Sequence, residues 1–418
     1  MKSNYRPIGD FIELVDVRNK DLQVDHLLGL SITKEFIPSV ANTVGTNMSN
    51  YKIIKKNQFA CSIMQVRRDK KMPVALLKDF DEAIISQAYP IFQVIDEELL
   101  SPDYLMMWFS RAEFDRHACF LAVGGVRGSL EWDDFLEMEL PVPSIEKQRE
   151  IVKEYNTIVN RIKLNEQLNQ KLEETGQALY KHWFVDFEFP DENGQPYKSS
   201  GGKLVYNEEL DKEIPEVYSC KSIGEYSTVK SGYAFKSNWW KTEGVPVIKI
   251  GSINNNTESF DALGYVEEEK IEFAKKYITE AGSIVIAMTG ATIGKIGIIP
   301  KLSSTILVNQ RVGMFDLGQN PVTKTPFLFL TLLTDSVINE IQNVGGDSAQ
   351  ANISNTQIEG IKIVYPLTEN INQFNSVLSP AFKSYLKRIE ENNFLNDLKN
   401  IILSKMSKVE SLKTEQAI

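Results

Sequence analysis

Hydrophobic residues recur at three- and four-residue spacings through a long polar stretch in the middle of the chain. They stand at Ile151, Tyr155, Ile158, Ile162, Leu168, Leu172 and Leu179. The steps between them are sums of the spacings that a coiled-coil seam requires. Pro143 and Ser144, a suitable N-cap, precede the pattern. The pattern predicts a helix over 144–185. Asn165 stands at the seam position that divides the step between Ile162 and Leu168.

A second long helix is predicted over 367–418. Its apolar positions are Leu378, Phe382, Tyr385, Ile389, Leu395, Leu398 and Ile402, with Asn392 in the seam position equivalent to Asn165. A helix of about 40 residues is roughly 60 Å long, which exceeds the width of a domain of about 150 residues. Each helix could pack on its own domain, or the two could pair antiparallel. Their length favours pairing, and Asn165 and Asn392 would then fix the register.

The two predicted helices belong to an internal repeat. The motif R-I-x-x-N-x-x-L-N stands at 161–169 and again at 388–396. Further pairs follow in the same order: Ile8-Gly9 with Ile223-Gly224, Gln87 with Gln310, Gly124-Gly125 with Gly345-Gly346, and 138–143 with 361–366. Insertions in loops explain why the offset between partners varies. Five matches in order indicate that the chain repeats one structural plan.

Short β-rich runs between Gly, Asn and Pro turns precede each helix, for example 245–250 and 283–288. The predicted fold class is therefore α+β, with two mixed α/β domains in a pseudo-twofold repeat, separated by two long antiparallel coiled-coil helices. A length of 418 residues also favours two domains. The predicted boundaries are 1–143 for the first domain, 144–185 for a central spacer helix, 186–366 for the second domain and 367–418 for a C-terminal spacer helix.

The composition argues against a membrane span, a signal peptide and a metal site. No run of about 18 uncharged apolar residues occurs, so we expect no membrane span. The N-terminal residues are acidic where a signal peptide needs an apolar stretch, so a cytoplasmic location is expected. The three cysteines and three histidines are scattered and lack the spacing of a zinc site, so no metal site is expected.

The net charge of −10 argues against indiscriminate binding to nucleic acid. A DNA-binding protein of this composition must concentrate its positive charge locally. The stretch 51–71 does so, because seven lysines and arginines face only Asp69 there. A solvated surface is the ordinary explanation of such a basic run, so the stretch alone does not establish DNA contact.

Residues 140–190 contain L-P-x-P at 140–143, E-x-Q at 146–148, a long predicted helix and W-F-V-D-F at 183–187. This segment resembles the central conserved region of the specificity subunits of Type I restriction-modification systems. Residues 231–253 resemble the opening of a target-recognition domain of that family, and 11–24 with 50–71 resemble it more loosely. The second conserved region, 367–410, is more divergent, because it lacks a Trp-Phe pair and keeps mainly the repeated motif.

The resemblance implies a non-catalytic subunit that recognises a bipartite target in double-stranded DNA. Its two domains would be target-recognition domains that each read one half-site, and the two helices would hold them apart. It would scaffold two methyltransferase subunits and two restriction subunits. S-adenosylmethionine, ATP and magnesium would serve those partners, and this chain would bind no cofactor. A stand-alone sequence-specific DNA-binding protein and a coiled-coil scaffold without DNA contact are the alternatives.

Motifs for catalysis are absent from the sequence, so we expect no catalytic residues. An amino-methyltransferase needs an Asn/Asp-Pro-Pro-aromatic motif, and 141–143 lack its polar and aromatic residues. Residues 290–296 resemble a Walker loop, but the spacer is one residue short and Ile296 has no hydroxyl for magnesium. Two interpretations of this stretch remain open: a simple glycine turn, or a turn whose backbone amides meet a DNA phosphate.

Residues expected to contact DNA combine donors for base edges with charge for phosphates, in loops of both domains. In the first domain they are Gln65, Arg67, Arg68, Lys70, Lys71 and Arg127. In the second domain they are Tyr233, Lys236, Thr292, Lys295, Gln310, Arg311, Gln350 and Asn352. The equivalence of Gln87 and Gln310 in the repeat supports the choice of these loops.

Overall fold

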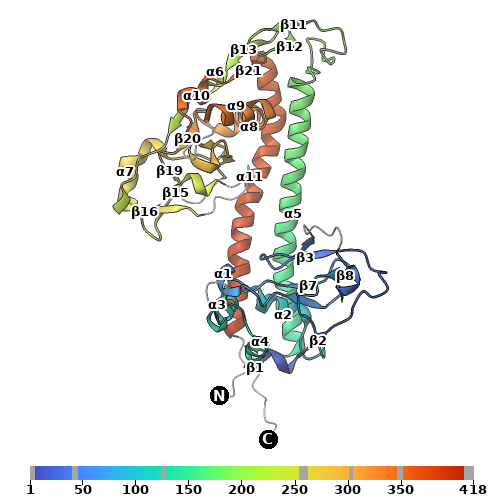
Figure 1. The fold of residues 1–418 in the computed structure, drawn as a ribbon. Helices are drawn as coiled ribbons and strands as arrows, with labels where there is room; N and C mark the ends of the chain where they lie inside the picture. Colours follow the sequence, from blue (N-terminus) through green and yellow to red (C-terminus); the bar gives the residue numbers. More distant parts are fainter. Residues whose placement is uncertain are drawn as a thin grey trace. The chain divides into compact units, whose positions relative to one another are not determined.

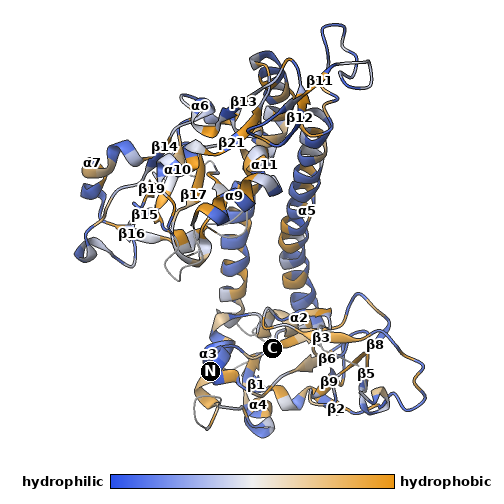
Figure 2. Ribbon diagram, turned by 45° about the horizontal axis from the view of Figure 1, so that its top comes forward, coloured by the Kyte–Doolittle hydropathy of each residue, from blue (hydrophilic) through white to orange (hydrophobic). Residues whose placement is uncertain are grey.

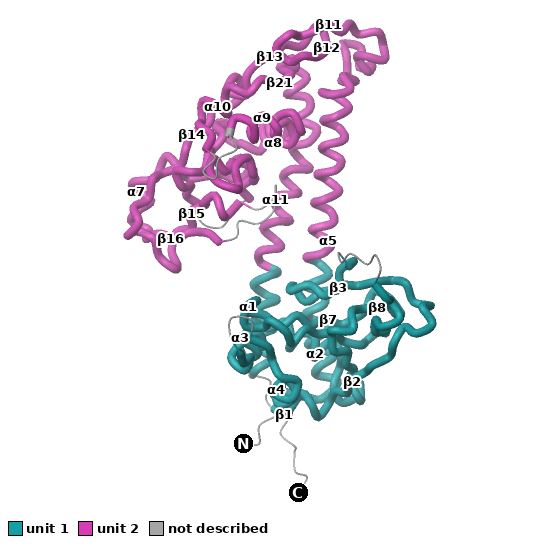
Figure 3. Tube along the Cα trace, in the orientation of Figure 1, with its two compact units in different colours: residues 1–161, 395–418 teal, residues 162–394 magenta. Residues whose placement is uncertain are grey.

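The computed structural model describes residues 5–39, 46–124, 128–253, 262–300, 305–345 and 352–408. The chain forms two compact units: unit 1 contains 1–161 and 395–418, and unit 2 contains 162–394 (Figure 3). Two long helices, α5 (Ile145–Phe184) and α11 (Thr368–Lys405), pass from one unit into the other (Figure 1). Because the units divide these helices, they do not test the predicted domain boundaries, which stay a prediction.

A four-stranded antiparallel sheet lies at the centre of unit 1, in the strand order β2-β9-β6-β7. Its strands are β2 (Ile12–Val15), β6 (Phe59–Cys61), β7 (Val74–Leu76) and β9 (Ile91–Val94). Phe59 and Phe92 stack in the core with ring centroids 4.9 Å apart, and Phe109 meets Phe59 edge-on at 5.8 Å. The aromatic core thus joins the sheet to the helices that follow it: α2 (Pro102–Phe109), α3 (Ala112–Leu121) and α4 (Trp132–Glu137).

Shorter elements complete unit 1. They are β1 (Tyr5–Pro7), η1 (Ile8–Asp10), β3 (Leu28–Leu30), β4 (Phe36–Pro38), η2 (Met48–Asn50), β5 (Lys52–Lys55), α1 (Val66–Asp69), β8 (Glu82–Ile85), β10 (Glu139–Pro141) and η9 (Met406–Lys408). The strands among them form three two-stranded sheets, β1-β10, β3-β4 and β5-β8. The start of α5 and the end of α11 also belong to this unit, because Ile151 and Leu403 are buried in its main core.

Unit 2 has a four-stranded antiparallel sheet in the order β14-β20-β17-β18. Its strands are β14 (Val229–Ser231), β17 (Ile284–Ala287), β18 (Ile296–Ile298) and β20 (Val312–Phe315). A three-stranded sheet contains β15 (Val245–Ile248), β16 (Gly264–Val266) and β19 (Leu307–Val308). The other elements are β11 (Leu204–Asn207), β12 (Lys212–Pro215), β13 (Ser219–Ser222), α6 (Ile223–Tyr226), η3 (Ser237–Trp239), η4 (Ile250–Ser252), η5 (Glu268–Lys270), α7 (Ile271–Ala274), η6 (Lys275–Tyr277), η7 (Gly290–Thr292), η8 (Pro321–Thr323), α8 (Thr325–Leu332), α9 (Asp335–Gly345), α10 (Asn355–Gly360) and β21 (Lys362–Tyr365).

The same plan is built twice. The sheet β14-β20-β17-β18 corresponds strand for strand to β2-β9-β6-β7, and β13-β21 corresponds to β1-β10. Gly9 and Gly224 stand just after β1 and β13, where an added Cβ would come within 3.0 Å of Leu136 and 2.9 Å of Glu359. This close approach of α4 and α10 explains why an Ile-Gly pair recurs in the sequence. The predicted α+β repeat is confirmed.

Within unit 2 the two long helices run antiparallel. Nδ2 of Asn165 donates to Oδ1 of Asn392 at 2.8 Å, and Nε of Arg388 donates to Oδ1 of Asn169 at 2.7 Å. Residue numbers therefore rise along one helix as they fall along the other. Figure 2 shows α5 as a mainly hydrophilic helix interrupted by hydrophobic residues, as a helix with a narrow buried seam should be. The predicted pairing of the helices is confirmed within this unit.

Two residues of the predicted seams are exposed, one on each long helix. Leu168 is 43% exposed, whereas the next residue, Asn169, is 1% exposed. The seam runs from Ile162 through Asn165 and Asn169 to Leu172, which preserves the alternation of three- and four-residue steps. The sequence pattern missed Asn169 because the apolar Leu168 stands next to it. On α11, the predicted seam residue Leu398 is likewise 47% exposed.

Replacing Asn165 and Asn392 together with isoleucine is expected to raise the thermal stability of the helix pair and to loosen its register. Oδ1 of Asn165 is buried without a hydrogen-bond partner in the described part of the chain, so an apolar pair removes a desolvation cost. The measurement is thermal unfolding combined with disulfide trapping between cysteines placed across the helices, in register and one turn out of register. Trapping of the native register alone would contradict this expectation.

A segment between α5 and β13 has no counterpart among the described residues of unit 1. It contains the β11-β12 hairpin, which pairs Leu204 with Pro215 and Asn207 with Lys212. Phe189, near its start, stacks on Tyr218 with ring centroids 4.5 Å apart. Phe189 and Ile214 are also buried in the main hydrophobic core of unit 2, so the segment packs onto the rest of that unit. Across the described ranges, no helix has the length and apolar character that crossing a membrane requires.

Candidate nucleic-acid interface

A short turn in unit 1 carries four of the five basic residues of that unit that are predicted to contact DNA. The turn connects β6 to β7 and contains α1. It begins and ends in the left-handed backbone region, with φ of 63° at Gln65 and 52° at Lys70. Non-glycine residues seldom adopt this conformation, so the surrounding structure must hold it. Gln65 is half-buried, and the exposed basic residues of the turn are Arg67, Arg68, Lys70 and Lys71.

A neighbouring segment supports this basic turn. The backbone N–H of Arg67 donates to the carbonyl of Gly128 at 3.2 Å, and its Nη1 donates to the carbonyl of Gly124 at 3.3 Å. The backbone N–H of Leu130 donates to the carbonyl of Ile63 at 2.9 Å and holds the same two segments together. These bonds set the direction of the Arg67 side chain. Arg127 lies outside the described residues and stays a prediction.

Asp115 fixes the other end of the basic turn. Its Oδ1 accepts a hydrogen bond from the backbone N–H of Met72 at 3.1 Å and from Nζ of Lys34 at 2.8 Å. Lys34 also donates to the carbonyl of Phe109. Burial lowers the pKa of Lys34, and the carboxylate of Asp115 opposes that shift. One buried carboxylate therefore joins the loop of Lys34, the corner between α2 and α3, and the residue that follows the turn.

Charge on the basic turn is unevenly compensated. Arg68 forms an ion pair with Asp69 at 2.6 Å, and this contact lowers the pKa of Asp69. Arg67, Lys70 and Lys71 form no ion pair within the described ranges of the chain. Uncompensated, exposed cations on a rigidly held turn are suited to contact phosphates of a DNA backbone.

Unit 2 has a turn at the equivalent position of the repeat. It connects β17 to β18 through η7, and Gly290 (φ 72°) and Gly294 (φ 81°) take the left-handed conformations seen at Gln65 and Lys70. The backbone N–H of Ile353 donates to the carbonyl of Met288 at 3.0 Å. This bond is equivalent to the one from Leu130 to Ile63 in unit 1. The predicted residues Thr292 and Lys295 lie on this turn and are half-buried. A strand-turn-strand arrangement differs from the strand-to-helix geometry of a Walker loop, in agreement with the sequence analysis.

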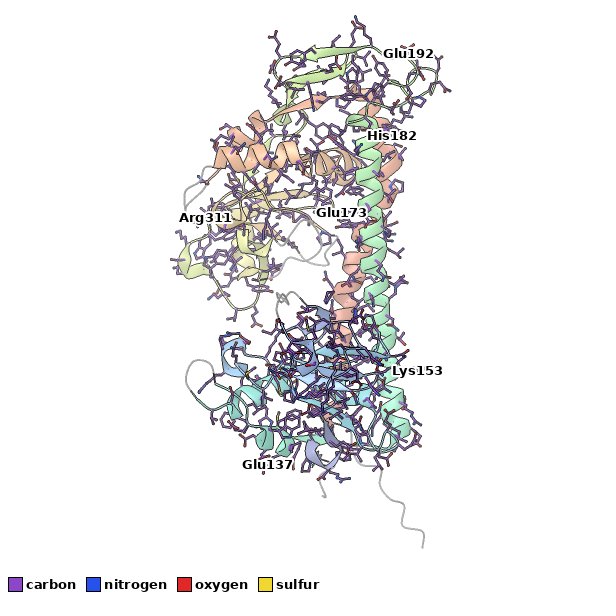
Figure 4. All side chains as sticks on the ribbon, turned by 45° about the vertical axis from the view of Figure 1, so that its right-hand side comes forward. Glu137, Lys153, Glu173, His182, Glu192 and Arg311 are labelled. Carbon is purple, nitrogen blue, oxygen red and sulfur yellow. The ribbon has the colours of Figure 1, made fainter. Side chains whose placement is uncertain are left out.

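A cleft of about 920 Å³ opens beside this turn. Three residues predicted from the sequence line it, Gln310, Arg311 and Asn352. All three are exposed, and Figure 4 labels Arg311. Gln350, predicted with them, lies outside the described residues. The structure thus brings together side chains from the β19-β20 connection and from the segment before α10.

Several polar residues of the cleft were missed by the sequence analysis: Ser231, Thr289, Ser354, Asn355 and Thr356. Ser231 Oγ donates to Oδ1 of Asn355 at 2.9 Å. Thr289 Oγ1 is buried without a hydrogen-bond partner in the described residues. Small hydroxyl and amide residues carry no charge signal, but the helix-capping pattern S-x-x-Q at 354–357 could have marked the segment. Together these groups can donate to and accept from the edges of bases.

Tyr233 and Lys236 lie in a separate aromatic group of unit 2. The Tyr233 ring stacks on Trp239 with centroids 6.1 Å apart, and Nζ of Lys236 lies 5.5 Å from the centre of the Trp239 ring. Trp239 is half-buried and Lys236 is exposed. Neither predicted residue lines the cleft, so their contact with DNA stays a prediction.

Comparison with known proteins places this geometry in a family. The family described as Type I restriction modification DNA specificity domain matches residues 5–174 and 215–400. A Type I restriction enzyme specificity subunit of Haemophilus influenzae, HindI, is 23% identical and is aligned over 85% of this chain and 86% of its own. The MjaIX specificity subunit of Methanocaldococcus jannaschii is 21% identical over 75% of this chain and 70% of its own.

A solved structure shares the fold. The crystal structure of a Type I restriction-modification system S subunit from M. genitalium superposes with a TM-score of 0.56, at 17% identity. The superposition covers 96% of this chain and 95% of the other. The two matched stretches of sequence also follow the two copies of the structural repeat. The chain therefore belongs to the Type I restriction-modification DNA specificity family, and the predicted function as a DNA specificity subunit is confirmed.

Proposed function

We propose that this chain recognises a bipartite site in double-stranded DNA, with one half-site read by each unit. The observation that carries the proposal is the repeated turn, which ends at Lys70 in unit 1 and at Gly294 in unit 2. Exposed cations accompany it in unit 1, and a polar cleft accompanies it in unit 2. Two equivalent but chemically different surfaces suit two different half-sites.

The chain is proposed to act without catalysis of its own, as a cytoplasmic scaffold for two methyltransferase subunits and two restriction subunits. Its relatives bear the names of specificity subunits, which supports assembly with other subunits. S-adenosylmethionine, ATP and magnesium are assigned to those partners. The net charge of −10 supports this division, because a strongly acidic chain gains from partners that supply part of the attraction to phosphates.

Sequencing of methylated DNA tests the proposal. The chain is produced with its methyltransferase subunit in cells that lack other DNA methylation. We expect one methylated motif made of two short defined sequences with an unread gap of constant length. Methylation of a single continuous motif, or none although a complex forms, would contradict bipartite recognition.

Substitutions in the two surfaces are expected to have different effects. Lys70→Ala should weaken binding to all DNA sequences and reduce the salt slope of log Kd by about 1, as the loss of one phosphate contact does. Asn352→Ala should leave the salt slope unchanged and cost about 1–3 kcal/mol of discrimination at one base pair. Fluorescence titrations of the complex with the methyltransferase, at several salt concentrations, measure both effects.

Lys198→Ala serves as the control for these titrations, because Lys198 is exposed in the segment between α5 and β13 and lies outside both surfaces. It should change neither the salt slope nor the specificity. Equal effects of Lys70→Ala and Lys198→Ala would remove the basic turn from the interface.

A further inference from the structure

A second cleft of unit 2, with a volume of about 540 Å³, lies away from the residues assigned to DNA reading. Its walls come from the end of α5, the β11-β12 hairpin, the α8-α9 connection and β21. We call it the hairpin cleft. Among its lining residues are Lys181, Lys212, Lys362, Leu210, Thr334 and Ser336. It therefore combines positive charge, hydroxyl groups and apolar surface.

Two of the three lysines are already paired. Nζ of Lys181 lies 2.7 Å from Asp186, and Nζ of Lys362 lies 3.1 Å from Glu209. Lys212 has no ion pair among the residues that the structure describes. Lys212 is exposed, yet protein atoms around its side chain displace part of the water from the charged form and thereby lower its pKa. The cleft thus has one positive charge that lacks a counter-charge and has lost part of its hydration.

The surroundings of Lys212 fit a peptide better than DNA. Leu210, Leu333 and Val337 line the cleft beside it, and such apolar surface offers nothing to a phosphate backbone. Asp335 also lines the cleft, so the cleft is not uniformly positive, as a surface for the closely spaced phosphates of a nucleic acid would be. A single carboxylate next to an apolar side chain matches one unpaired ammonium beside an apolar wall.

The hairpin that builds this cleft is not needed for the repeated fold. Unit 1 forms the same four-stranded sheet and the same glycine contact without a counterpart of the hairpin among its described residues. The family match also stops at residue 174 and resumes at 215. The hairpin therefore lies outside the match, except for its last residue, Pro215. An element that only one copy of the repeat has among the described residues is a reasonable place for a function of its own.

We propose that the hairpin cleft binds a partner-protein segment that places a carboxylate on Lys212 and an apolar side chain against Leu210. The segment belongs to the methyltransferase subunit, and this assignment rests on the scaffold role proposed above. A charge-assisted hydrogen bond to Lys212 and burial of the apolar side chain would together fix the segment in the cleft.

Chemical labelling of lysines tests this proposal without any substitution. The chain alone, and the chain in complex with the methyltransferase subunit without DNA, are treated with formaldehyde and borohydride, and each lysine is followed by mass spectrometry. Lys212 should be labelled in the chain alone and protected in the complex. Lys198, an exposed lysine of the same segment, should be labelled equally in both. Equal labelling of Lys212 in both samples would overturn the proposal.

A charge reversal gives the second measurement. Lys212→Glu should weaken association with the methyltransferase subunit about tenfold or more, the scale of one charge-assisted contact. Lys198→Glu, the matched control, should leave it unchanged. Protection of Lys212 by DNA instead of by the subunit would also overturn the proposal. If the unmodified chain forms no complex, the scaffold role itself fails, whereas a complex with an accessible Lys212 overturns the hairpin cleft alone.

Discussion

Replacing Asp115 with alanine is expected to destabilise unit 1 by about 3–5 kcal/mol, the cost typical of removing one member of a buried ion pair. Only 8% of the Lys34 side chain and 12% of the Asp115 side chain are exposed, so water cannot take the place of the carboxylate. The backbone N–H of Met72 loses its acceptor in the same change. Hydrogen exchange of peptides from each unit, measured by mass spectrometry, should show the loss in unit 1 alone.

The same substitution should also disturb the conformation of the basic turn, because Met72 follows the turn directly. We therefore expect Asp115→Ala to weaken methylation in vivo. The double variant K34M/D115L should recover part of the lost stability by replacing the ion pair with apolar side chains, although the backbone N–H of Met72 still lacks its acceptor. Asp103→Ala is the matched control. Asp103 pairs with Lys78 at 2.8 Å, but both side chains are more than a third exposed, so about 1 kcal/mol or less is expected. Equal losses for Asp115→Ala and Asp103→Ala would disprove the role of the buried pair.

Inserting four residues into each long helix, after Arg161 in α5 and before Leu395 in α11, is expected to lengthen the gap between the half-sites by roughly two base pairs. Four helical residues add roughly 6 Å and about one full turn, so the seam stays nearly in phase. Base pairs follow one another at about 3.4 Å, which converts the added length into the added gap. Sequencing of methylated DNA from cells with the variant measures the gap directly.

The two half-site sequences should be unchanged by this insertion, because no residue of the proposed reading surfaces is altered. Four residues inserted after Asn193, in the turn that links Asp191 to Gln195, provide the control and should leave the gap as it is. A gap of unchanged length in the helix variant would show that the helices do not set the spacing.

The sequence predicted the architecture well because the architecture has local signatures. The periodicity of 151–179 and of 378–402 predicted both long helices, and the length of those helices predicted their pairing. The repeated R-I-x-x-N-x-x-L-N motif contains Asn165, Asn169, Arg388 and Asn392, which are the residues that hydrogen-bond across the helices of unit 2. The motif thus includes Asn169, which the apolar pattern left out of the seam, but it also includes Leu168, which is exposed.

The candidate interface was only partly predictable. Clustered charge identified the turn of Arg67 to Lys71, and the repeat led to Gln310. Ser231, Thr289 and Asn355 escaped notice, because they come from three distant segments and carry no charge. Only the sheet order of unit 2 brings their side chains to one cleft.

What the sequence by itself determined is the repeat, the two helices, the fold class and the family, since each depends on patterns that neighbouring residues record. Tertiary structure alone decided which side chains share a surface. Asp115 meets Lys34 across 81 residues, and Lys212 shares a cleft with Lys181 and Lys362 only when the hairpin packs beside α5 and β21. Burial and pairing of charges depend on contacts between distant segments, and no local pattern encodes them.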